Sequence, residues 1–249
     1  MIVNVHRLDK DNLGDQVCSP CSYFEELKTV GQIDMDSEWP KGDTLLVGGG
    51  GMLHGSWTEK LSQYALTNSM IAWGIGLNNH GTSSFVWPKF LDYFKAVGLR
   101  DFGNPWDYVP CVSCMHEAFD ECRQMSPRFP VVIYEHLHNP IEVGSGMPRM
   151  SNRQPRHFFR EAVRFLSFGE TVLTNSFHGA YWAMLLGRRV VIYKPFSNRF
   201  HSFEGGYICA DENDWMGAIE SAKPPVDGYL AKCRDLNIQF FNGKVKPLI

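Results

Sequence analysis

The segment from Thr171 to Tyr193 reads TVLTNSFHGAYWAMLLGRRVVIY. It begins with a mostly β-branched run that stops at Asn175, continues as an apolar segment that ends at Gly187, and closes with a second apolar run from Val190. This order predicts a strand, a tight turn, a buried helix and a second strand. Strands that are buried on both faces of a parallel sheet read as continuous apolar runs. The segment therefore indicates an α/β fold.

Polar residues stand where the first strand of this segment is expected to become the helix: Asn175, Ser176 and His178. Ligands of open α/β sheets bind at the carboxyl ends of the strands. The first turn of a helix also has unpaired backbone N–H groups, which favour an anion. We therefore predict that His178 meets an anionic ligand, and that Ser176 and Gly179 help to bind it.

The alternation of strands and helices occurs on both sides of a break between Glu117 and Pro127. Strands are expected at residues 1–5, 44–47, 70–76, 129–134, 171–174, 190–193 and 207–210, and helices at 57–69, 84–97, 156–168, 177–186 and 211–222; residues 139–155 read as a loop. Strands that alternate with helices form parallel sheets with right-handed crossovers. We predict two Rossmann-like halves, residues 1–122 and 123–249, whose parallel sheets face a cleft that holds the site.

Composition excludes several classes of protein. No run approaches the roughly 18 apolar residues of a membrane span, and the N-terminal residues lack the pattern of a signal peptide. The net charge is −3 and no dense Lys/Arg block occurs, which argues against a nucleic-acid partner. Seven cysteines, an odd number without a secretion signal, indicate reduced thiols. We therefore expect a cytoplasmic protein.

Two cysteine pairs have the spacing of metal or redox sites, Cys18 with Cys21 and Cys111 with Cys114. Together they would supply the four thiolates of a zinc site. The separation of the two pairs far exceeds the spacing of a zinc ribbon, and cysteine often packs as a small hydrophobic residue. Packing is the default expectation and zinc the alternative; we assign no metal site.

An Asn-Leu-Gly-Asp motif at residues 12–15 follows the first expected strand. Gly14 allows a ligand to approach the backbone closely, and Asn12 and Asp15 offer an amide and a carboxylate at the same place. We predict that these three residues belong to the site. A simple turn with an aspartate cap is the other interpretation.

Four consecutive glycines, Gly48 to Gly51, follow the second expected strand. Their backbone N–H groups suit a phosphate, a sugar or a carboxylate, and we assign this role to Gly49, Gly50 and Gly51. The motif lacks the last glycine of a dinucleotide fingerprint and the lysine of a P-loop. A structural turn is the alternative here.

Three motifs occur in order along the chain: Asn-Leu-Gly-Asp at residues 12–15, the glycines at 48–51, and Ser-Phe-His-Gly at 176–179. Together they resemble the polysaccharide pyruvyltransferase family. The resemblance covers the chain from Asn12 to about Arg199, although many members have Arg-Leu-His where this chain has Ser176-Phe177-His178. It implies a GT-B-like fold. It also implies transfer of a pyruvyl group from phosphoenolpyruvate to sugar hydroxyls of a glycan or glycan precursor as a ketal, without a metal or a cofactor.

The resemblance also implies roles for single residues. His178 would donate a proton to the enol carbon or assist the leaving phosphate. Asp15 would accept a proton from the acceptor hydroxyl. Arg100 looks like the family's mid-chain arginine, and it would hold the phosphate and carboxylate together with Lys194 and Arg199, which follow the strand at residues 190–193.

Two other functions stay open. A glycosyltransferase with a nucleotide-sugar donor would use the same glycine-rich loop and helix N-terminus, with Glu204 on a ribose or sugar hydroxyl. A non-catalytic glycan-binding relative would bind a ligand without turnover. One fold hosts many chemistries, so the fold alone does not decide between these functions.

Overall fold

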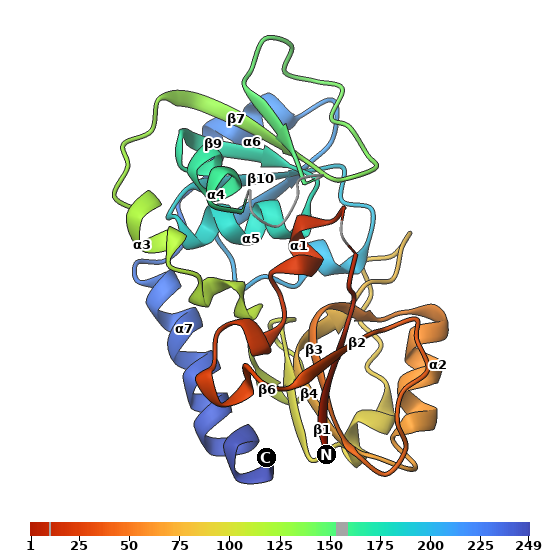
Figure 1. Cartoon of the computed structure of the whole chain (residues 1–249). Coiled ribbons are helices and arrows are strands. Elements are labelled where there is room, and N and C mark those ends of the chain that lie inside the picture. The colour runs from red at the N-terminus through yellow and green to blue at the C-terminus, as the bar shows by residue number, and fades with distance from the viewer. Residues whose placement is uncertain (10, 153–158) are drawn as a thin grey trace.

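The computed structural model describes residues 1–9, 11–152 and 159–249. It is an α/β protein with two sheets, one of six strands and one of five, interleaved with helices (Figure 1). Every strand pair within these sheets is parallel. The predicted fold class, two Rossmann-like halves with parallel sheets, is therefore confirmed.

The first sheet has the strand order β2-β1-β3-β4-β5-β6. Its strands are β1 (Ile2–His6), β2 (Gly31–Asp34), β3 (Thr44–Leu53), β4 (Ser69–Leu77), β5 (Ala96–Leu99) and β6 (Asp107–Tyr108), and its helices are α1 (Leu13–Gln16) and α2 (Gly55–Tyr64). All residues of β4 from Met70 onward are buried. This burial on both faces explains why that stretch of sequence is a continuous apolar run.

The second sheet has the strand order β11-β10-β9-β7-β8. Its strands are β7 (Phe129–Glu135), β8 (Arg149–Ser151), β9 (Gly169–Thr174), β10 (Arg189–Tyr193) and β11 (Tyr207–Ala210), and the helices around it are α3 (Ala118–Cys122), α4 (Phe159–Ser167), α5 (Phe177–Leu185) and α6 (Trp215–Ser221). The strand–helix–strand unit predicted from residues 171–193 is β9, α5 and β10.

Helix α5 lies between the second sheet and the first half of the chain (Figure 1), and all of its residues are buried. On the side away from the sheet, the Tyr181 hydroxyl donates to the Cys111 carbonyl at 2.9 Å and the Trp182 indole N–H donates to Ser113 Oγ at 3.0 Å. A helix that is covered on all sides is hydrophobic all round, as this sequence is. The site residues at its N-terminus are thereby held against both halves.

The chain returns to the first half at its C-terminal end through α7 (Tyr229–Phe240), which ends in a π-helical turn. The Trp73 indole N–H donates to Asn237 Oδ1 at 2.8 Å, and Phe240 and Phe241 pack around Trp73. Both chain ends lie beside the first sheet (Figure 1). The strands fall on either side of the predicted boundary, but residues 123–249 include a tail that packs on the other half.

The predicted helix at residues 84–97 is wrong. The chain there forms a 3₁₀ turn over Lys89–Tyr93 and then enters β5. The backbone N–H of Lys95 already donates to the carbonyl of Met70, at the start of pairing with β4. Sheet pairing satisfies the backbone groups that a helix would otherwise have used.

The strand that begins at Thr44 runs through the four glycines to Leu53 instead of ending before them. Its register with β4 becomes irregular between Gly50 and Leu53. Glycine within a strand often marks a bulge or a close backbone approach. The irregular register is consistent with a bulge. The close approach is at Gly49, where a Cβ would lie 2.1 Å from the Cys18 carbonyl oxygen.

The predicted loop at residues 139–155 contains a short strand, β8, which pairs with β7. Helix α4 agrees with the predicted helix 156–168 from Phe159 onward, and the start of that predicted helix lies outside the described residues. Across the described ranges, no helix combines the length and the apolar character that crossing a membrane requires.

Candidate functional site

Residues that follow the carboxyl ends of strands in both sheets line a cavity between the two halves. The cavity has two adjoining chambers, which share Asn12, Asp15, Gly51, His136 and Arg199. The inner chamber has a volume of about 40 Å³ and the outer chamber about 220 Å³. One water molecule needs roughly 10–15 Å³ of such space. The inner chamber therefore has room for a group of about the size of a phosphate or carboxylate.

Two arginines bring positive charge to the inner chamber. Arg100 directly follows β5, and Arg199 lies in the 3₁₀ turn after β10. Neither forms an ion pair with a carboxylate among the described residues, and the Nε of each is buried without a hydrogen-bond partner there. Burial, and then the charge of Arg100, lower the pKa of Arg199 to about 9. Unpaired buried cations are costly, so an anion in this chamber would stabilise both.

Two glycines make the space for the Arg100 side chain. A Cβ on Gly76 would lie 2.8 Å from its Cγ, and a Cβ on Gly51 would lie 3.2 Å from its Nη2. The guanidinium carbon lies 3.8 Å from the ring centroid of Phe177, a cation–π contact. The first sheet thus supplies the space for Arg100, and α5 supplies the surface on which it rests.

His178 lies in the first turn of α5, beyond the N-cap Ser176, whose hydroxyl accepts from the Gly179 N–H. Its side chain is 7% exposed and lines the inner chamber. Burial, and then the charges of Arg100 and Arg199, lower the pKa of His178 well below its usual value. The imidazole is therefore neutral near pH 7.

Gly14 fits directly against the His178 ring, since a Cβ there would lie 2.0 Å from His178 Nδ1. We expect Gly14→Ala to displace the ring or α1, to lower the melting temperature and to abolish anion binding. The matched control is Gly217→Ala in α6, where a Cβ meets nothing within 4 Å. That change should be neutral or stabilising by up to about 1 kcal/mol. Thermal unfolding with and without phosphate measures the stability and the anion binding of both variants. If Gly14→Ala and Gly217→Ala had the same melting temperatures under both conditions, the close fit of Gly14 against His178 would be contradicted.

Asn12 and Asp15 form the wall on the α1 side. Asn12 Nδ2 donates to Asp15 Oδ2 at 2.8 Å, while Asn12 Oδ1 accepts from the Gly14 N–H and from Asn152 Nδ2. Burial, and then the nearby charge of Asp9, raise the pKa of Asp15 to about 7, against the opposing effect of the arginines. A base with a pKa near neutrality is suited to proton transfer.

The raised pKa of Asp15 predicts a pH dependence of anion binding. The unfolded carboxyl loses its proton near its ordinary value of 3.8, whereas the folded one keeps it to about 7. Folding stability contributed by this group therefore falls between these values, and above about pH 7 the carboxylate repels an anion. We expect sulfate affinity to weaken several-fold from about pH 6 to pH 8.

Asp15→Asn should remove this dependence and should be more stable than the wild type at pH 8. Sulfate is the probe because it does not titrate in this range, and calorimetric titration at both pH values measures the affinity. Glu59→Gln on the exposed face of α2 is the control and should keep the wild-type profile. If the sulfate affinity of Asp15→Asn still weakened from pH 6 to pH 8, another group would be the cause of the pH dependence.

The outer chamber contains Arg7, Trp57 and three histidines, His54, His80 and His136. Burial, and then the charge of Arg199, lower the pKa of His136 to about 4; burial, and then His80, lower that of His54. Imidazole rings and an indole beside polar groups form a surface suited to a polar molecule with apolar faces.

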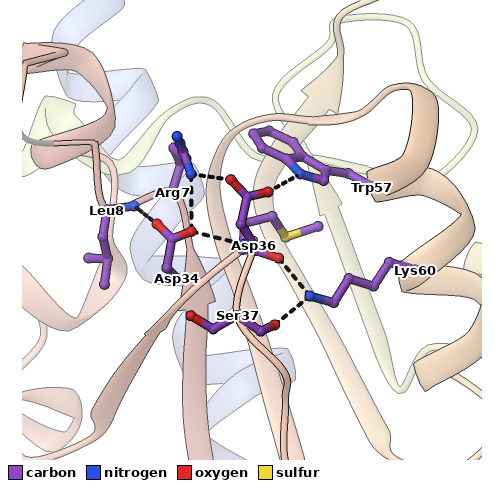
Figure 2. A network of polar contacts seen from close by, with 8 residues as sticks. Arg7, Leu8, Asp34, Asp36, Ser37, Trp57 and Lys60 are labelled. Carbon is purple, nitrogen blue, oxygen red and sulfur yellow. Dashed lines mark hydrogen bonds and ion pairs between the residues drawn. The ribbon is translucent and has the colours of Figure 1, made fainter.

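A polar network on the first half holds Arg7 and Trp57 in place (Figure 2). Arg7 donates to the carboxylates of Asp34 and Asp36, and the Trp57 indole N–H donates to Asp36 Oδ1 at 2.7 Å. Lys60 donates to the Met35 carbonyl at 2.9 Å on the far side of the same loop. Because the carboxylates already neutralise Arg7, the unpaired charge of the cavity lies at the arginines of the inner chamber.

Backbone contacts tie the two halves together beside Arg199. The Asn79 N–H donates to Asn198 Oδ1 at 2.9 Å, and the Asn198 N–H donates back to the Asn79 carbonyl at 3.1 Å. The Gly81 N–H donates to the Phe196 carbonyl at 3.0 Å. The loop after β4 thus fixes the loop after β10, and this positions Arg199 over the first half.

The structure brings most of the predicted site residues together. Those that line the chambers are Asn12, Asp15, Gly50, Gly51, Arg100, Ser176, His178 and Arg199. Gly49 and Gly179 lie behind the wall, where a Cβ would meet Cys18 and Tyr134 respectively. Their role is to allow close packing, not to contact a ligand.

Lys194 and Glu204 lie outside the chambers. Lys194 has a left-handed backbone with φ of 47°, and its exposed side chain pairs with Glu212. Glu204 pairs with Lys232 of α7. Neither residue lines the chambers, so this cavity does not support the predicted contact of Lys194 with a substrate or the alternative role of Glu204.

The cysteine pairs do not form a zinc site. Cys18, Cys111 and Cys114 belong to one apolar cluster and Cys21 to another. Within the part of the chain that is described, no three His, Cys, Asp or Glu side chains are arranged to hold a metal ion. Burial raises the pKa of all four thiols. They pack as small buried side chains, which was the default expectation.

Among the residues of the outer chamber that were not predicted, four share a signal in the sequence. Arg7, His54, His80 and His136 lie one to three residues beyond the ends of β1, β3, β4 and β7. Parallel strands bring their carboxyl ends to one edge of a sheet. Polar residues just beyond every buried run, not only beyond the conspicuous motifs, were therefore candidates.

Comparisons with known proteins give a fold and no family. No protein-family model and no curated protein matches the sequence. The fold is similar to the crystal structure of a functionally uncharacterized protein from Klebsiella pneumoniae, with a TM-score of 0.53 and 17% sequence identity over 84% of this chain and 92% of that one. Similarity at this level shows the fold alone, and the resemblance to the pyruvyltransferases stays a prediction.

Proposed function

We propose that the inner chamber binds the phosphate or carboxylate of phosphoenolpyruvate, and that the protein transfers the pyruvyl group to sugar hydroxyls of a glycan or glycan precursor. The observation that carries the proposal is the pair of buried arginines, Arg100 and Arg199, which have no carboxylate partner among the described residues and line a chamber with His178 and Asp15. Charge-assisted hydrogen bonds to an anion are about twice as strong as neutral ones.

The proposed reaction replaces the phosphate by two sugar oxygens. One hydroxyl proton goes to the methylene carbon, which becomes a methyl group, and the second goes to the departing phosphate. Both new bonds form between sugar oxygens and the former enol carbon, so the products are a ketal and inorganic phosphate. Asp15, with a pKa of about 7, would accept a hydroxyl proton, and the arginines would stabilise the leaving phosphate.

The two chambers support a division between donor and acceptor. Arg100 and His178 line the inner chamber alone, whereas Trp57, His54 and His80 line the outer chamber alone. Arg199 and His136 line both. We assign the donor to the inner chamber and the sugar acceptor to the outer one. A cytoplasmic location is part of this proposal, since all seven cysteines are free thiols.

Thermal unfolding with a ligand panel tests the proposal. The panel contains phosphoenolpyruvate, pyruvate, phosphate, and UDP-, GDP- and CMP-sugars. A ligand that binds only the folded state at a hundred times its dissociation constant stabilises it by about 2.7 kcal/mol. We expect phosphoenolpyruvate to raise the melting temperature most, and an acceptor screen for phosphate release to follow.

Other results of the ligand panel would indicate a different function. A shift with nucleotide-sugars alone would make it a glycosyltransferase, and this would overturn the proposal. Binding of phosphoenolpyruvate or a glycan without any turnover across the acceptor screen would indicate a non-catalytic relative. No shift with any anion would reject the inner chamber as an anion site.

A further inference from the structure

His178 lines the inner chamber, and its ring nitrogen Nε2 lies at the end of a row of buried polar side chains. We infer that a directed chain of hydrogen bonds holds His178 in one tautomer, with its proton on Nδ1 and its Nε2 unprotonated. The chain consists of Trp182, Ser113 and Cys111, and we call it the backing chain. From the sequence, Cys111 was expected to pack or to bind zinc, and its contact with α5 depends on the fold, because the members of the chain come from α5 and from the segment before α3.

The geometry of the backing chain is continuous. The Trp182 indole nitrogen lies 3.0 Å from Ser113 Oγ, which lies 3.2 Å from Cys111 Sγ. Cys111 Sγ lies 3.5 Å from His178 Nε2. All four side chains are buried, so no bulk water competes for these contacts.

The direction of the chain follows from the chemistry of its first member. An indole N–H only donates, so Ser113 Oγ must accept from Trp182. The single hydroxyl proton of Ser113 then has Cys111 Sγ as its remaining partner. Cys111 stays a thiol, because burial raises its pKa. Its one proton is donated to Nε2, which must therefore be the unprotonated nitrogen of the neutral ring.

The opposite nitrogen is left to carry the proton. His178 Nδ1 lies against Gly14, and it has no hydrogen-bond partner among the described residues. A neutral imidazole has one N–H, and the tautomer is set by the bond that the other nitrogen makes. The ring therefore presents an N–H donor without a positive charge beside the two arginines.

This tautomer has a consequence that rests on the proposed function. The Nδ1–H would donate to an oxygen of the bound phosphate or carboxylate, and it would hold that oxygen as it gains charge. Cys111 and Ser113 are positioning residues in this scheme, since they act through His178. The scheme selects, from the two predicted roles of His178, assistance to the leaving phosphate.

Nitrogen-15 NMR of the full, uniformly labelled chain tests the tautomer directly. Long-range correlations between ring protons and ring nitrogens at pH 7 distinguish the two neutral tautomers and the charged ring. The His178 signals are identified by their absence in His178→Gln. We expect Nδ1 in the protonated range and Nε2 in the unprotonated range; a proton on Nε2 would overturn the inference.

Variants separate the backing chain from mere packing. Cys111→Ala removes the donor to Nε2, and we expect the ring to lose its preference for the Nδ1–H form. Cys111→Ser keeps a donor and should keep that form. Cys122→Ala removes a buried thiol of the same apolar cluster outside the chain and should leave the ring signals unchanged. If the tautomer survived in Cys111→Ala, the thiol would not be its cause.

The outcome does not depend on the substrate. The wild-type spectrum is recorded without any ligand, so it decides the tautomer even if Cys111→Ala fails to fold or phosphoenolpyruvate fails to bind. Conversely, a proton on Nε2 together with a clear stabilisation by phosphoenolpyruvate would reject the backing chain and leave the proposed function standing.

Discussion

His178→Gln should lower the release of phosphate from phosphoenolpyruvate by a factor of about a hundred or more in the presence of a sugar acceptor. His178 lies just after the N-cap of α5 and lines the inner chamber together with both arginines. Loss of a positioned donor to a developing oxyanion costs roughly 10²–10³ in rate, and loss of a general acid roughly 10²–10⁴. Coupled detection of inorganic phosphate measures the rate.

The control is His138→Gln, because His138 is exposed. It should retain activity within a few-fold, and both variants should keep the wild-type far-ultraviolet circular dichroism. Glutamine replaces a buried ring with a flexible amide, so a modest loss of thermal stability at His178 is expected. If activity at His178→Gln stayed within a few-fold of the wild type, the proposed role of this histidine would be wrong.

The parts of the fold that could be predicted are those where burial determines the sequence. The β9–α5–β10 unit and β4 are covered on both faces, so their apolar runs are unambiguous. Residues 84–97 have helical spacing, but they form a 3₁₀ turn and a strand because β5 pairs with β4. The return of α7 to Trp73 depends on contacts distant in sequence, which local periodicity does not reveal.

The candidate site was predictable where a motif coincides with a strand end. Asp15 and His178 were found in this way, and they share one chamber. Lys194 also follows a strand, yet its left-handed backbone leaves the side chain paired with Glu212. A strand end predicts the edge of the sheet on which a residue lies, but the direction of its side chain depends on the turn that follows.

Arg100→Gln should abolish the stabilisation of the protein by phosphoenolpyruvate and by phosphate. A hydrogen bond to a charged group contributes roughly 1.5–3 kcal/mol, so even a single lost contact weakens binding by about 10- to 150-fold. The same change removes a buried cation that repels Arg199, whose pKa is lowered partly by Arg100. The ligand-free variant should therefore be as stable as the wild type or more stable.

Arg100→Gln is thus expected to lose stabilisation by the ligand and to keep or gain stability without it. This combination distinguishes a ligand-binding arginine from a structural one. A structural arginine would lower the melting temperature of the free protein when it is replaced, whatever the ligand. Arg189→Gln is the control, since Arg189 is exposed at the amino end of β10, opposite the site; it should change neither quantity. Thermal unfolding of the three proteins, with and without phosphoenolpyruvate, measures both. A different result would contradict this interpretation: Arg100→Gln strongly destabilised without ligand, yet still stabilised by phosphoenolpyruvate. It would show that the charge of Arg100 stabilises the fold, because a cation that serves only to bind an anion is not needed in the ligand-free protein.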